Sequence, residues 1–180
     1  VDIQPVATQI SKLRFFISLI VDQKVNTKKD NFGIRPLPNL ETKFVAANTL
    51  IGIEKPKAQI TFGSAEVKAL EEQLKDVRHR LFSAKTPATK RKLREEDKIL
   101  REQMGNLLIK SGWENETARQ LAGWDPYDQN TSSPFFDPEW MFGLIEGFDV
   151  VIGNPPYIFT RDADFSDEFK NYITDNYSSL

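Results

Sequence analysis

The sequence predicts an α/β protein in which parts of a parallel sheet are separated by an inserted antiparallel helical hairpin. Residues 150–152 form a β-branched run, Val-Val-Ile, which is typical of a strand covered on both faces. Residues 44–47 predict a second short buried strand. Apolar residues within 54–124 recur instead at spacings of three and four, which is the helical period. We therefore divide the chain at these boundaries into 1–53, 54–124 and 125–180.

The composition of the 180 residues describes a soluble globular protein. Apolar residues make up 39% and charged residues 28% of the chain, and the net charge of −2 excludes a strongly basic nucleic-acid binder. The absence of cysteine and the single histidine, His79, argue against a disulfide framework and against a metal site. No apolar run is long enough to span a membrane, so we expect no membrane partner.

The first element is predicted to be a strand end followed by a long helix. Pro5 fits the first helical turn, where the missing N–H costs nothing. One apolar stripe follows, and we expect it to pack deep against the sheet. The stripe consists of Val6, Ile10, Leu13, Ile17 and Ile20. Asp2, at the tip of the strand, is either a ribose-binding carboxylate of a nucleotide-binding fold or a turn residue at the helix entry.

Two helices with narrow apolar seams follow, joined by a short break at 83–87. The predicted seam residues are Val67, Leu70, Leu74, Val77 and Leu81 on the first helix, and Leu93, Leu100, Met104 and Leu107 on the second. Thr86 is a good N-cap and Pro87 suits the first helical position. Such seams predict an antiparallel hairpin packed like a coiled coil. Basic side chains gather around its tip: Arg78, His79, Arg80, Lys85, Lys90, Arg91, Lys92 and Arg94. They are candidates for DNA phosphate contacts, for a contact with another domain or a second copy, or for an ordinary solvated face.

The segment from residue 125 leads back to the predicted sheet. Asp137 is expected to cap a short helix that opens at Pro138, and Trp140 and Leu144 are expected to cover one sheet face. The strand at 150–152 then ends in Asn154-Pro155-Pro156-Tyr157. Consecutive prolines stiffen this turn at the carboxyl end of the strand, where ligands bind in open α/β sheets.

The side chains of this turn suit the binding of a planar amino group. The Asn154 amide oxygen and the Pro155 carbonyl are two acceptors for the hydrogens of one NH₂ group, which frees the nitrogen lone pair for attack. The ring of Tyr157 offers a face on which a flat base can stack. A rigid loop without a function is the alternative interpretation.

Residues 148–158 resemble motif IV of the S-adenosylmethionine-dependent amino-methyltransferases, in particular the adenine-N6 DNA methyltransferases, whose motif begins with Asn or Asp followed by Pro-Pro-Tyr. The same tetrapeptide occurs in release-factor glutamine methyltransferases. Residues 36–50 and 125–157 also resemble the long methyltransferases of type IIG restriction–modification enzymes and related phage-defence systems.

The resemblance implies an incomplete Rossmann-like methyltransferase sheet and a set of site residues. Asn154, Pro155, Pro156 and Tyr157 would be catalytic. Asp2, Ile3 and Asn48 would bind S-adenosyl-L-methionine, although many relatives carry Asp at the position of Asn48, which could instead cap a turn. The implied partners are double-stranded DNA with a flipped adenine and other domains of a parent enzyme, with self-association through the hairpin as a further partner interaction. The implied location is the cytoplasm of a bacterium or archaeon.

Two alternatives to an adenine methyltransferase stay open at this point. One is glutamine methylation of a protein, against which stands the connection from 54 to 146, much longer than an ordinary crossover. The other is a non-catalytic helical interaction module. The chain starts at Val1 and has no Gly-x-Gly loop after a strand, so we expect a fragment of a longer enzyme. Alone, it is expected to bind S-adenosylmethionine weakly or not at all and to be inactive.

Overall fold

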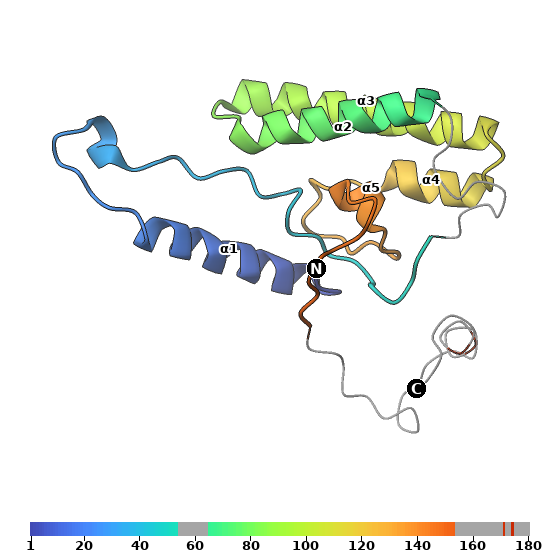
Figure 1. The fold of residues 1–180 in the computed structure, drawn as a ribbon, viewed down its shortest axis with the longest axis horizontal. Helices are drawn as coiled ribbons and strands as arrows, with labels where there is room; N and C mark the ends of the chain where they lie inside the picture. Colours follow the sequence, from blue (N-terminus) through green and yellow to red (C-terminus); the bar gives the residue numbers. More distant parts are fainter. Residues whose placement is uncertain (54–64, 154–170, 172–173, 175–180) are drawn as a thin grey trace. The chain divides into compact units, whose positions relative to one another are not determined.

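The computed structural model of the chain describes residues 1–53, 65–153, 171 and 174. The chain divides into two compact units, Val1–Gly147 and Phe148–Leu180. All the named helices of the described residues lie in the first unit (Figure 1). They are α1 (Pro5–Val21), the 3₁₀ turn η1 (Asp30–Gly33), α2 (Ala65–Ser83), α3 (Pro87–Lys110), α4 (Asn115–Gly123) and α5 (Pro138–Phe142). None of these helices is long and apolar enough to cross a membrane.

The predicted helical hairpin is confirmed. Helices α2 and α3 lie side by side, joined by three residues (Figure 1). The Thr86 side chain caps α3 by accepting from the Thr89 N–H at 3.2 Å, and Pro87 occupies the first turn. The helices bury most of the predicted apolar seams, but Leu70 is only half-buried and Leu108 is buried in place of Leu107. The buried residues are Val67, Leu74, Val77 and Leu81 on α2, and Leu93, Leu100, Met104 and Leu108 on α3.

Helix α4 packs against the C-terminal part of α3 and extends the hydrophobic core. Its buried residues, Ala118 and Leu121, are both fully enclosed. The two helices approach closely because Gly105 of α3 has no side chain. A Cβ atom on Gly105 would lie 2.7 Å from the Ala122 Cβ atom and 3.4 Å from the Ala118 carbonyl oxygen. Gly105 therefore sets the spacing of this helix pair.

We expect Gly105→Ala to destabilise the chain by about 1–2 kcal/mol, because the cost of overpacking exceeds the gain in helix propensity. The double variant Gly105→Ala/Ala122→Gly removes the clashing methyl group and is expected to recover most of the loss. Urea unfolding followed by circular dichroism measures both changes. A stabilisation by Gly105→Ala alone would show that α4 can move away at no cost.

Helix α5 begins as predicted, but it ends at Phe142, before Leu144, and it does not have the predicted neighbour. The Asp137 carboxylate accepts from the Trp140 N–H at 2.7 Å, Pro138 lies in the first turn, and Gly143 ends the helix in the left-handed conformation. Trp140 is buried in one hydrophobic cluster with residues of α2 and α3. The prediction that Trp140 and Leu144 cover a sheet face is therefore wrong for Trp140, whose indole packs within a helical core.

The α/β fold class is also wrong for the described residues. They are helical and contain no strand, so the incomplete Rossmann-like sheet is absent from this part of the chain. Two isolated parallel bridges, Asp2 with Ala46 and Ala47 with Ser133, are the extended pairings among them. A ladder needs several successive pairs, and here each segment supplies only one, so the predicted strand at 44–47 reduces to bridge residues.

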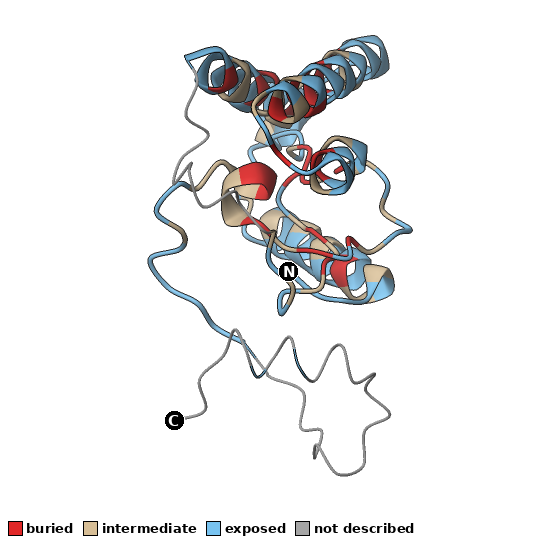
Figure 2. Ribbon diagram, turned by 90° about the vertical axis from the view of Figure 1, so that its right-hand side faces the viewer, coloured by how far each residue is buried: buried red, intermediate tan, exposed pale blue. Residues whose placement is uncertain are grey.

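The long helix after Pro5 forms as predicted, but its apolar stripe is not buried. The side chains of Val6, Ile10, Leu13, Ile17 and Ile20 are between 50% and 65% exposed. In Figure 2 the helix that follows the N-terminus is pale blue and tan along most of its length. The buried residue of α1 is Thr8, whose hydroxyl donates to the Pro5 carbonyl. Within the described part of the chain, no sheet is present to cover this stripe.

Residues 150–152 likewise do not form the buried strand predicted for them. Val150, Val151 and Ile152 lie outside any strand and are 72%, 81% and 92% exposed. A β-branched run becomes a strand only when neighbouring strands pair with it, and the described residues supply none.

Candidate functional site

Backbone hydrogen bonds draw three separate segments together around Asp2. The Asp2 N–H donates to the Val45 carbonyl at 3.2 Å, and the Ala47 N–H donates to the Asp2 carbonyl at 2.9 Å. Ser133 joins the other side of the second segment, because its N–H donates to the Ala46 carbonyl and its carbonyl accepts from the Asn48 N–H. Two of the predicted cofactor residues, Asp2 and Asn48, thus lie on neighbouring segments.

The Asp2 side chain forms a turn at the entry to α1 through one carboxylate oxygen and leaves the other oxygen able to accept a hydrogen bond. Its Oδ1 atom accepts from the Gln4 N–H at 2.8 Å, just before α1 begins at Pro5. The side chain is exposed, and its Oδ2 atom has no hydrogen bond among the described residues. A helix-entry turn and an outward-facing carboxylate are therefore compatible in the same residue.

Asn48 and Ile3, the other two predicted cofactor residues, lie close to Asp2 in space or in sequence. The Asn48 Oδ1 atom accepts from the Leu50 N–H at 3.1 Å, which leaves its amide NH₂ as a donor. The Ile3 side chain is 58% exposed and offers an apolar surface beside Asp2. A carboxylate, an amide and an apolar side chain fit the ribose and the base of a nucleoside. We call Asp2, Ile3 and Asn48 the N-terminal corner.

A buried ion cluster holds the segment that carries Ser133. The Asp97 carboxylate of α3 is fully buried and accepts from two arginines, Arg78 Nε at Oδ1 and Arg101 Nε at Oδ2, each at 2.8 Å. Arg101 Nη1 also donates to the carbonyls of Ala122 and Trp124, at 3.0 and 2.6 Å. The cluster therefore ties the hairpin to the chain that leaves α4.

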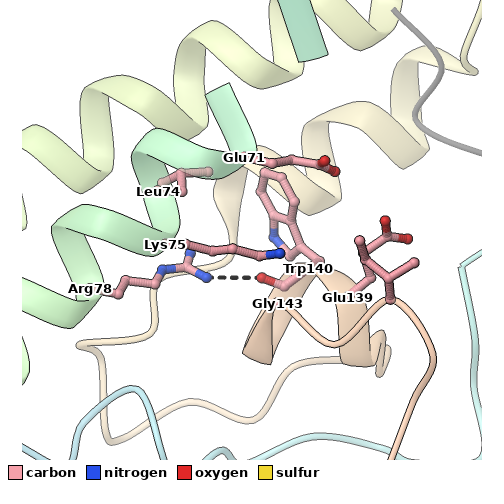
Figure 3. A pocket seen from close by; sticks show the side chains of 8 residues that line it. Glu71, Leu74, Lys75, Arg78, Glu139, Trp140 and Gly143 are labelled. Carbon is pink, nitrogen blue, oxygen red and sulfur yellow. Dashed lines mark hydrogen bonds between the residues drawn. The ribbon is translucent and has the colours of Figure 1, made fainter. Parts of the chain in front are cut away.

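The same cluster reaches α5 through Arg78. Its Nη1 atom donates to the Trp140 carbonyl at 2.9 Å (Figure 3). Its guanidinium carbon lies 5.6 Å from the centroid of the Trp124 ring. These bonds fix both ends of the segment 124–140, within which Ser133 meets the N-terminal corner. Asp97 is not a residue of the N-terminal corner, but through Arg78 and Arg101 it holds the segment that carries Ser133 to the corner.

Burial near Asp97 raises the pKa of Tyr127 well above its ordinary value, and the negative charge of Asp97 acts in the same direction. The phenol therefore stays protonated in the folded chain at pH values where an exposed tyrosine ionises. Because the folded state binds this proton more tightly than the unfolded state, the contribution of Tyr127 to stability is complete below about pH 10 and falls as the pH rises further.

We expect the difference in free energy of unfolding between the wild type and Tyr127→Phe to be constant below about pH 10 and to shrink above it. The reason is that only the wild type must keep a buried phenol neutral there. Urea unfolding from pH 8 to 11 measures the difference, and the titration of lysines cancels because both proteins contain the same lysines. A difference independent of pH would mean that Tyr127 is solvated.

The basic tip of the hairpin is partly neutralised. Three of its arginines form ion pairs: Arg78 with Asp97, Arg80 with Asp76 and Glu96, and Arg94 with Glu41. In the described part of the chain, four tip cations form no ion pair: Lys85, Lys90, Arg91 and Lys92. A local run of basic residues is thus a poor guide to free positive charge.

The sequence contains a signal for the ion cluster that helical periodicity alone does not reveal. Asp97 lies on the apolar seam of α3, four residues after Leu93 and three before Leu100. A carboxylate at a seam position requires buried partners, and Arg101 follows it at the i,i+4 spacing. The second partner, Arg78, is brought in by the hairpin.

The remaining predicted site residues, Asn154, Pro155, Pro156 and Tyr157, lie outside the described residues. Among the residues that are described, no group of three or more His, Cys, Asp or Glu side chains could hold a metal ion.

Comparison with known proteins identifies one family. No curated protein and no solved structure matches the chain. All of residues 1–180 match a family described as Eco57I restriction-modification methylase. The chain belongs to this family of restriction–modification methylases.

Proposed function

We propose that the chain contributes to the catalytic unit of an adenine-N6 DNA methyltransferase of a restriction–modification system, with S-adenosyl-L-methionine as the methyl donor. One observation carries the proposal. The chain belongs to a restriction–modification methylase family over its whole length, and it contains Asn-Pro-Pro-Tyr at residues 154–157. Those residue types are suited to holding the amino group of a flat base.

The N-terminal corner supports a role in cofactor binding. The free Oδ2 atom of Asp2 would accept hydrogen bonds from the two ribose hydroxyls, as acidic residues do in nucleotide-binding sites. Ile3 would pack on the adenine ring of the cofactor. Asn48 would meet the edge of that ring through its side-chain amide. The cofactor, when bound, supplies a methyl group on a positively charged sulfur atom.

Asn154 and Pro155 would hold the target amine. Their two carbonyl oxygens accept the two hydrogens of the adenine amino group, so that its lone pair faces the methyl donor. Holding the reactants in line supplies most of the rate enhancement, and no metal ligand is required from the chain. Tyr157 would stack on the base and Pro156 would keep the turn rigid.

The target adenine must leave the duplex for this reaction. Its amino group is paired inside the base stack, where no methyl donor can reach it, so the nucleotide flips into a pocket. Unstacking costs a few kcal/mol, and stacking on Tyr157 would offset part of this cost.

Product analysis tests the proposal. The full-length protein is incubated with tritiated S-adenosylmethionine and either unmethylated DNA or a release factor, and labelled DNA is digested to nucleosides for mass spectrometry. We expect label in DNA as N6-methyladenine. Label in N4-methylcytosine would exclude the adenine specificity, and label in the protein alone would replace the proposal by glutamine methylation.

A further inference from the structure

A hollow of about 400 Å³ lies between α2, α5 and the turn at residues 42–43. Its walls combine basic and apolar side chains. Lys43, Lys75 and His79 are exposed at its edge, while Phe82, Met141 and Phe142 are buried or half-buried within it. We call this the α2–α5 hollow. It is separate from the N-terminal corner and uses none of the predicted site residues.

The α2–α5 hollow carries uncompensated positive charge. No carboxylate lines it, and Lys43 and Lys75 form no ion pair among the described residues. Arg78 also lines it, but its charge is balanced by Asp97. Two acids, Glu71 and Glu139, line a smaller neighbouring hollow that also includes Lys75 (Figure 3). Both acids have other interactions. An occupant should therefore be anionic.

The cationic wall is held in position. Gly143 has a φ of +72°, and a Cβ atom there would lie 2.6 Å from Lys75 Cε, so the lysine stem lies directly over the glycine. Figure 3 shows Lys75 running towards Trp140 and Gly143 from α2. Less conformational entropy is lost on binding when a lysine stem is already packed.

The apolar wall is equally ordered. Met141 is 1% exposed, and the Phe142 ring packs against Phe136 with their centroids 6.2 Å apart. Phe82 completes this wall from the last turn of α2. An occupant with an apolar or flat part next to its negative charge would match both walls, and a simple inorganic anion would use only one of them.

We propose that the α2–α5 hollow binds one phosphodiester group of the DNA substrate together with its sugar, away from the target base. Lys43, Lys75 and His79 donate to the phosphate oxygens, and Phe82 and Phe142 contact the sugar. Phosphate contacts of this kind fix the register of a protein on the duplex. The proposal rests on the proposed function, because that function makes DNA the substrate.

Fluorescence anisotropy with the full-length protein and a labelled 20-bp duplex, over a series of salt concentrations, tests the site. We expect Lys43→Gln/Lys75→Gln to weaken binding about tenfold and to lower the slope of log K against log salt by about 1–2. The matched control is Lys110→Gln/Arg119→Gln, which removes the same charge from exposed positions at the other end of the helical core. It should leave affinity and slope unchanged.

Three results would overturn the site. Equal losses of DNA affinity in both double variants would indicate only an effect of bulk charge. Unchanged affinity in both variants, or no DNA binding by the wild type, would exclude DNA as the occupant. Poly-glutamate competing as well as DNA at equal charge would point to an acidic protein.

Circular dichroism verifies the fold of each variant. Methyl transfer by the wild type separates the two proposals. Failure of the proposed function removes N6-methyladenine from the wild-type product, whereas failure of the site leaves that product and gives equal affinities in the two double variants.

Discussion

Asp97→Ala is expected to lower the free energy of unfolding by about 3–5 kcal/mol, the largest stability change that we predict for a single side chain. The substitution leaves the guanidinium groups of Arg78 and Arg101 buried without their shared carboxylate. A buried charge without a counter-ion costs far more than the net value of the pair. Arg101 is only 5% exposed, so water cannot easily replace the lost carboxylate.

The matched control is Asp76→Ala. Asp76 also forms a 2.8 Å ion pair with an arginine on the same hairpin, Arg80, but its side chain is 64% exposed. Its loss should cost less than about 1 kcal/mol. Urea unfolding followed by circular dichroism measures both variants. Equal losses would show that the location of Asp97 in the seam has no special importance.

Asp97→Ala should also be visible at the tryptophans. Arg78 joins Asp97 to the Trp140 carbonyl and lies over the Trp124 ring, so loosening the cluster should change their surroundings. We expect the tryptophan emission of the folded variant to shift to longer wavelength, while Asp76→Ala keeps the wild-type spectrum. Such a shift would also show that the segment leading to Ser133 is held by the cluster.

The features that the sequence predicted correctly depend on neighbours in the chain. The N-cap at Thr86, the short helix opened by Pro138 and the seam residues of the hairpin each follow from a few residues within one or two turns. Capping and helical periodicity are properties of a local segment, and they survive in any tertiary setting that accommodates the segment.

The features that failed depend on partners that lie elsewhere. The stripe along α1 and the run at 150–152 have the composition of buried elements, yet both are exposed. Composition shows that an element favours burial, but it does not identify the part of the protein that would pack against that element. Arg78, expected at a basic tip, is similarly turned inward by Asp97, a residue 19 positions later.

In the candidate site, too, the features set by local sequence could be predicted and those set by distant contacts could not. Short motifs predict Asp2 and Asn48 as site residues, and backbone hydrogen bonds bring their segments together through Val45, Ala47 and Ser133. The pairing of Ser133 with Ala47 could not be read from spacing, because it depends on how the ion cluster places the segment after α4. The α2–α5 hollow was also invisible in the sequence, since its lining comes from three distant segments.

The largest functional effect is expected at Asn154. Asn154→Ala in the full-length protein should lower kcat for methyl transfer to DNA by about 10²–10³-fold, the usual cost of removing one hydrogen-bonding group that acts in the transition state. The amide oxygen of Asn154 is proposed to bind an amino hydrogen as the nitrogen attacks. KM for DNA and the affinity for the cofactor should change little, because the interaction strengthens only as charge develops.

Two further variants make this result specific to the acceptor. Asn154→Asp keeps an oxygen at the same position and should retain activity within about tenfold, because a carboxylate also accepts from an amino group. Asn106→Ala removes an asparagine from the exposed face of α3 and should have no effect. A single-turnover measurement with tritiated donor separates the methyl-transfer step from product release. If Asn154→Ala stays within threefold of the wild type, the turn at 154–157 does not hold the target amine, and another acceptor must orient it.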